Sequence, residues 1–172
     1  MWEKQVMVNA SIYKTIFGVK LTHKSVFLLA FLALFPNILG MISLNTPFGF
    51  NFHFFQILIF LAAVLYGPVG GATSGLFGSF YTAVILNNPY IIVGNIILGL
   101  FTGVFVRKKI PVVGAAMLAF SIQLPWLWYS DIFLAGMNVM AVNGVMIALF
   151  AGNLFWALIA SGSYKKIRSL IR

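Results

Sequence analysis

The chain has no cysteine, and only two of its 172 residues are acidic and two are histidines. The absence of cysteine excludes disulfides, thiolate metal sites and a cysteine nucleophile. Two histidines and two acidic residues are also too few for a metal-binding cluster. These absences argue against most hydrolytic and redox chemistry, so we expect a protein that is not an enzyme and that holds neither a metal nor a cofactor of its own.

Apolar residues are what the chain has in excess, at 62% of the sequence against 8% charged residues. A soluble domain of this length cannot bury that proportion in one core. Because a membrane-spanning helix needs roughly 20 apolar residues, the composition predicts an all-α integral membrane protein with six transmembrane helices. The turn-prone breaks between apolar runs give the predicted spans as residues 25–44, 52–66, 72–86, 90–106, 110–129 and 136–161.

Three regions follow from these spans. Residues 1–24 carry four lysines among apolar residues and are predicted to be an amphipathic segment on the cytoplasmic membrane surface. Residues 25–161 form the six-helix transmembrane domain, and residues 162–172 form a basic cytoplasmic tail. No small-residue cleavage site follows a short apolar core near the N-terminus, which argues against a cleavable signal peptide.

The positions of the basic residues predict the topology, because lysine and arginine are retained on the cytoplasmic side. All eleven lie in the N-terminal segment, in the loop at 107–109 or in the tail. Six spans place these three regions on one face, with both termini cytoplasmic. The loops at 45–51, 87–89 and 130–136 then face outward, and the net charge of +9 reflects membrane topology rather than binding of nucleic acid.

Polar side chains within the spans gather near the outer face. A rise of 1.5 Å per residue places Asn95, Gln123 and Asn143 roughly 7 to 11 Å below the outer surface. This level predicts a pocket that opens outward and is walled by aromatic rings. The candidate substrate-binding residues are Asn95, Gln123, Trp126, Trp128, Asn138, Asn143, His53 and Gln56.

Each of these residues also has a structural interpretation. The amides are suited to hydrogen bonding between helices, and Trp126 and Trp128 fit an interfacial aromatic belt. His53 is suited to a satisfied interfacial position, and Asp131 to a solvated loop charge or a helix cap. Since the spans contain no basic side chain, the expected ligand is a neutral or singly charged heterocycle, with helix N-termini able to hold one carboxylate.

Small residues recur at helical spacing and predict close helix contacts within the chain. Gly71, Gly75 and Ser79 are four residues apart, as are Gly99 and Gly103. Ala30 and Ala33 form a small notch that suits a helix of this chain or of a partner, and they are the candidate docking surface.

The run from Leu65 to Gly75, Pro89, and the run from Val93 to Gly103, which contains Gly-Asn-x-x-x-Gly, together resemble the S components of energy-coupling factor (ECF) transporters. The resemblance implies a prokaryotic cell-membrane subunit that captures a vitamin-like small molecule. It also implies docking on an ECF coupling (T) subunit driven by two cytoplasmic ATPases, so that ATP is used by partner subunits. Many members carry alanines four apart in span one for docking, whereas Ala30 and Ala33 are three apart.

Other functions remain open from the residues alone. A small self-contained channel or facilitator fits the glycine-rich helices, although its polar residues should extend through the full depth. A structural membrane subunit would use the same amides for stability only. An intramembrane protease is disfavoured because neither His23 nor His53 lies in a span after Ser74. Within the solute-binding interpretation, the loop at 45–51 is the candidate lid.

Overall fold

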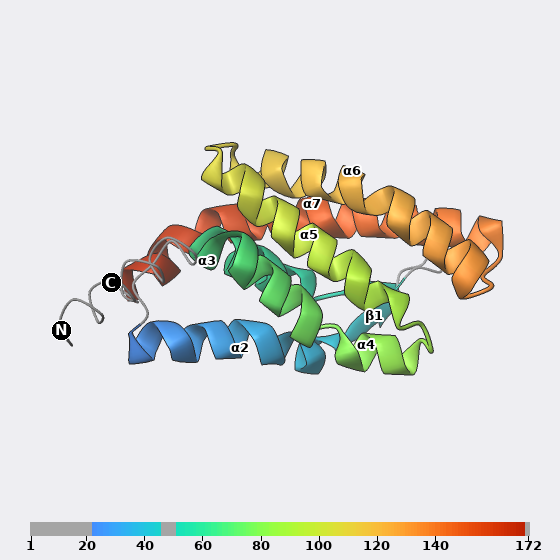
Figure 1. Cartoon of the computed structure of the whole chain (residues 1–172), viewed down its shortest axis with the longest axis horizontal. Coiled ribbons are helices and arrows are strands. Elements are labelled where there is room, and N and C mark those ends of the chain that lie inside the picture. Colours follow the sequence, from blue (N-terminus) through green and yellow to red (C-terminus); the bar gives the residue numbers. More distant parts are fainter. Residues whose placement is uncertain (1–21, 46–50, 171–172) are drawn as a thin grey trace, which may run out of the picture.

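The computed structural model describes residues 22–45 and 51–170 (Figure 1). This part of the chain is helical apart from one short antiparallel hairpin, in which Ser43 pairs with His53 and Asn45 pairs with Asn51. Residues 1–21 of the predicted amphipathic segment and 46–50 of the candidate lid lie outside the described residues. The elements in chain order are α2 (His23–Gly40), β1 (Ser43–Asn45), β2 (Asn51–His53), α3 (Gln56–Phe77), α4 (Phe80–Ile85), α5 (Tyr90–Arg107), α6 (Val112–Tyr129), the π-helix η1 (Ser130–Leu134) and α7 (Val139–Leu170).

Five helical segments of the described chain are long and apolar enough to cross a membrane, which is compatible with a multi-pass membrane protein. They are His23–Gly40, Gln56–Ile85, Tyr90–Arg107, Val112–Leu134 and Val139–Ser169. The sequence predicted six such segments. The difference lies in the second one, because the predicted spans 52–66 and 72–86 are joined there into one stretch of helix.

That stretch reverses its direction at Gly67. This residue has φ 71° and ψ −158°, a backbone conformation that is essentially restricted to glycine, and Pro68 follows it. A Cβ built on Gly70 would lie 2.9 Å from the carbonyl oxygen of Ala62. In a continuous helix these two positions would be about 12 Å apart along the axis. Helix α3 therefore consists of two arms that fold back on each other, with Gly67 at the apex.

The second arm of α3 lies against α2 and is held there by side-chain hydrogen bonds to backbone carbonyls. Tyr66 Oη, at the apex, donates to Ser25 O at 2.7 Å, and Ser74 Oγ donates to Leu32 O at 2.6 Å. Asn37 donates to Phe77 O at 2.7 Å and accepts from Tyr81 N at 2.9 Å, which bridges the break between α3 and α4. Asn37 thus stabilises the break between α3 and α4. Its own helix, α2, is not interrupted at Pro36 and continues to Gly40.

Glycines let the second arm of α3 approach α5 at backbone distance. A Cβ on Gly71 would overlap the carbonyl group of Gly99, and a Cβ on Gly75 would overlap that of Asn95. A Cβ on Gly103 would meet the backbone of Gly67 and Pro68 at the apex. The small residues of both helices therefore serve packing within the chain, as the sequence predicted.

Helices α6 and α7 form a long hairpin that lies beside α5 (Figure 1). After Pro125, which sits inside α6 without ending it, the chain turns through η1 and through Gly136 at φ 67°. Helix α7 then runs from Val139 to Leu170, so the predicted boundary between a sixth span and a basic tail falls inside one helix. The start of α2 and the end of α7 lie at the same end of the bundle (Figure 1).

Candidate solute-binding site

A cavity of about 260 Å³ lies at the end of the bundle where α3 and α5 begin. Its wall comes from β2, α3, α4, α5, α6, η1 and α7, so almost every element of the described chain contributes to it. We call it the amide cavity after the five amide side chains on its wall: Gln56, Asn88, Asn95, Gln123 and Asn153. The other polar residues that line it are His53, Thr82 and Asp131.

Unsatisfied hydrogen-bonding groups concentrate around this cavity. Across the described residues, the buried side-chain polar atoms without a hydrogen-bond partner all belong to its wall, with the single exception of Ser25 Oγ. Each such atom costs roughly 1–3 kcal/mol when it is left unpaired. The atoms on the wall are His53 Nδ1, Gln56 Oε1, Thr82 Oγ1, Gln123 Oε1 and Asn153 Oδ1. This arrangement favours a polar molecule in the cavity over a purely structural role for the amides.

Two further polar side chains on the wall are held by neighbours. Asn95 Nδ2 donates to Ser79 Oγ at 2.8 Å, and Ser79 Oγ in turn donates to Gly75 O at 2.6 Å. Asn88 Nδ2 donates to Asp131 Oδ1 at 2.7 Å, while Asn88 Oδ1 accepts from Tyr90 N at 3.1 Å. These contacts fix the side of the cavity formed by α4, α5 and η1.

The cavity carries one carboxylate and no lysine or arginine. Asp131 is the only acidic residue among those that the structure describes, and it is 5% exposed. Burial lowers the pKa of His53 below its ordinary value, so its imidazole is neutral near pH 7. Because Asp131 is buried, the expectation of a solvated loop charge at this residue is wrong. One carboxylate without any lysine or arginine makes the cavity favour a positive or neutral ligand over an anion.

Local backbone features create the space and the turns that the site needs. A Cβ on Gly94 would lie 2.8 Å from Leu127 Cδ2 and 3.2 Å from Gln123 Nε2, so glycine at this position leaves room for the Gln123 amide. Asn87 has φ 48° and ends α4 with Asn88 N donating to Ala83 O at 2.9 Å. Asparagine is one of the few residues that tolerate this conformation, and the turn places Asn88 beside Asp131.

Half of the predicted site residues lie elsewhere. His53, Gln56, Asn95 and Gln123 line the cavity. Asn143 is exposed on another face of α7, and Asn138 Oδ1 accepts from Met140 N at 2.8 Å at the start of that helix. Trp126 Nε1 donates to Tyr90 O at 3.1 Å, and Trp128 is 43% exposed beside Phe133. The depth estimate gave the level of each side chain along its helix and not the face from which it projects.

Four residues that line the cavity were not predicted as site residues from the sequence: Thr82, Asn88, Asp131 and Asn153. For Asn153 a signal was present, because it continues the inward face of α7 through Val145 and Leu149 at helical spacing. Asn153 reaches the level of the cavity because α7 begins farther out along the bundle than α3. Trp156 Nε1 donates to His53 O at 2.8 Å, which aligns the fifth turn of α7 with the start of α3.

The predicted docking notch is divided between two environments. Ala33 is 5% exposed and belongs to the core of the bundle, whereas Ala30 is exposed on α2. The two alanines therefore do not form one outward surface.

No protein-family model matches the chain, and no match was found among the curated proteins or the solved structures. The described residues bring together no group of three or more His, Cys, Asp or Glu side chains that could hold a metal ion. The amide cavity and the helices that surround it are therefore the features that bear on function.

Proposed function

We propose that the protein is the substrate-binding subunit of an ECF-type importer in a prokaryotic cell membrane. It captures a small vitamin-like solute at the outer face and docks on a coupling subunit whose two cytoplasmic ATPases use ATP. The observation that carries the proposal is the amide cavity, where five unpartnered polar atoms converge at one end of a strongly apolar helical bundle. A structural subunit would gain nothing from leaving these groups unpaired.

Six membrane passes are part of this proposal. The reversal at Gly67 divides Gln56–Ile85 into two passes, which together with the four other long helices makes six. With six passes, Lys108 and the end of α7 lie on the same face as the start of α2. This face collects the basic residues and is therefore cytoplasmic.

A cysteine-free chain allows this topology to be tested with single introduced cysteines. Val69 is 37% exposed beside the apex. We expect cysteines introduced at Val69 and at Lys108 to react with a membrane-impermeant maleimide from the cytoplasmic face. A cysteine at Leu86 should react from the outer face only. If α3 and α4 crossed the membrane once, Val69 would lie near the bilayer centre. A cysteine there that is unreactive from both faces would contradict the six-pass topology.

The chemistry of the cavity restricts the solute. A volume of about 260 Å³ corresponds to roughly nine water molecules at ~30 Å³ each. This volume lies at the small end of the range of ligand pockets, which begins at ~300 Å³ for drug-sized ligands, and it suits a solute of one or two rings. Three unpartnered amide oxygens and one carboxylate favour a ligand rich in N–H donors. We infer a neutral or singly positive nitrogen heterocycle.

Thermal unfolding of the purified protein in detergent tests the function directly. The panel contains vitamins, their precursors and nucleobases, and a ligand at 100 times its dissociation constant should add about 2.7 kcal/mol to the free energy of unfolding. One clear stabilising compound supports a binding subunit. If the protein is well folded and no compound stabilises it, a channel or a structural role is favoured instead.

Two asparagines on α7 provide a matched test of the site. Asn153→Leu should weaken binding of the stabilising compound about tenfold, because it removes one polar partner worth about 1.4 kcal/mol. Asn143→Leu makes the same chemical change on the exposed face of the same helix and should leave the dissociation constant unchanged. Both constants are measured by isothermal titration calorimetry. An equal loss in the two variants would contradict the assignment of the cavity.

A further inference from the structure

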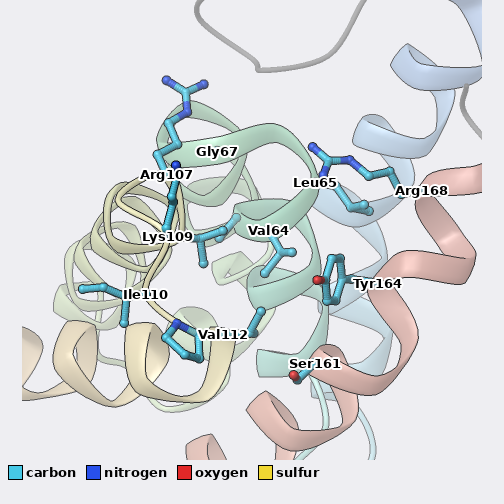
Figure 2. Close-up of a pocket in the computed structure, with 13 residues that line it drawn as sticks. Val64, Leu65, Gly67, Arg107, Lys109, Ile110, Val112, Ser161, Tyr164 and Arg168 are labelled. Carbon is cyan, nitrogen blue, oxygen red and sulfur yellow. The ribbon is translucent and has the colours of Figure 1, made fainter.

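A second cavity, of about 470 Å³, lies at the opposite end of the bundle (Figure 2). It is enclosed by the apex of α3, the connection between α5 and α6, and the last turns of α7. Three basic side chains line it, Arg107, Lys109 and Arg168, and no acidic residue does. Tyr164 and Ser161 add two hydroxyl groups to the wall. We call this site the basic cavity.

The basic side chains reach the cavity from two sides. Figure 2 shows Tyr164 and Arg168 projecting from α7 toward the apex of α3, with Arg107 and Lys109 on the other side of the apex. The apolar part of the wall includes Val64 and Val112. The wall of this cavity therefore combines basic and hydroxyl side chains with apolar ones.

Lys109 occupies a backbone position that ordinarily favours glycine. Its φ is 66°, and it follows the end of α5 in a Schellman turn, with Lys109 N donating to Val106 O at 2.9 Å and Ile110 N donating to Phe105 O at 3.1 Å. A side chain in this conformation is strained, and glycine would relieve the strain. The chain thus carries a positive charge on the cavity wall despite a local conformational cost.

The apex of α3 also leaves room for the side chain of Arg107. A Cβ on Gly67 would lie 2.6 Å from Arg107 Nη2, so the guanidinium group lies directly over the glycine backbone. The same glycine provides the reversal of α3. The turn between the two arms and the position of Arg107 therefore depend on one residue.

We propose that the basic cavity binds a phosphate group, supplied by the headgroup of an anionic phospholipid. Guanidinium groups bind phosphate oxygens through paired hydrogen bonds, and lysine and hydroxyl donors complete such a site. Basic pockets between helices on the cytoplasmic side of a membrane bind anionic headgroups, and the apolar part of the wall suits the lipid backbone next to the phosphate. The site is separate from the amide cavity and does not depend on the identity of the solute.

The test compares two double variants of the full chain in detergent. Lys109→Gln/Arg168→Gln removes two charges from the cavity wall, and Lys165→Gln/Lys166→Gln removes two charges from exposed positions at the same end. Binding of dioleoyl phosphatidylglycerol, with dioleoyl phosphatidylcholine as the neutral comparison, is measured by native mass spectrometry. We expect at least tenfold weaker phosphatidylglycerol binding in the cavity variant, less than threefold change in the exposed variant, and weak phosphatidylcholine binding in all three proteins.

A second measurement, with inorganic phosphate, distinguishes a lipid headgroup from a soluble phosphate compound as the ligand. If millimolar phosphate alone raises the melting temperature of the wild type and not of the cavity variant, the site takes a soluble phosphate compound; if only phosphatidylglycerol does so, it takes a headgroup. Equal losses in both double variants would show nonspecific charge attraction and overturn the proposal, as would unchanged binding in the cavity variant. Both variants should keep wild-type helix content and solute binding, which keeps this result independent of the amide cavity.

Discussion

Gly99→Ala should destabilise the protein by about 3 kcal/mol, although alanine favours a helix over glycine by about 1 kcal/mol. A Cβ on Gly99 would overlap the backbone carbonyl of Gly71, and a Cβ on Gly71 would overlap that of Gly99. Neither neighbour is a flexible side chain that could turn aside. The second arm of α3 and α5 would have to separate, which would also disturb the Asn95 contact with Ser79.

The control for this variant is Gly162→Ala on α7, because nothing lies within 4 Å of a Cβ built there. The melting temperature in detergent should fall by about 6–12 °C for Gly99→Ala and rise by about 2–4 °C for Gly162→Ala. Helix propensity alone predicts the same sign for both variants. A rise in both melting temperatures would therefore contradict the backbone contact between α3 and α5.

The sequence predicted helix positions well where an apolar run is bounded by turn residues. The predicted span 90–106 is observed as Tyr90–Arg107, and 110–129 as Val112–Tyr129. The predicted break at residues 67–71 is confined to Gly67, and the helix resumes at Pro68. Composition could not show that the break is a tight reversal within a continuous stretch of helix, because that depends on the φ of Gly67 and on its neighbours in space.

The candidate site was predicted in part, and the errors have one physical origin. Distance along a helix follows from residue counting, whereas the face of a side chain depends on how the helix is rotated in the bundle. Asn143 and Asn153 are ten residues apart on α7, and only the latter faces inward. The burial of Asp131 could not be predicted from composition, because it depends on the π-helix η1, which turns the side chain toward Asn88 and away from solvent.

Asp131→Asn should weaken binding of a cationic solute on the order of 100-fold, about 2.8 kcal/mol, which lies within the cost of removing one partner of a buried charge pair. The carboxylate is 5% exposed, accepts one hydrogen bond from Asn88, and shares the cavity wall with no lysine or arginine. An asparagine side chain has nearly the same shape and retains an oxygen that accepts from Asn88. The variant therefore removes the charge and leaves the cavity intact.

Benzamidine and benzamide form a matched pair of probes for this prediction, because they share a planar one-ring shape and differ in charge. Calorimetric titration of the wild type should show tighter binding of benzamidine, and Asp131→Asn should bring its dissociation constant close to that of benzamide. Binding of benzamide should change little, since it depends on the amides and not on the carboxylate. If both probes weakened equally, Asp131 would be maintaining the shape of the cavity through Asn88 and η1. If neither changed, its carboxylate would not face the ligand.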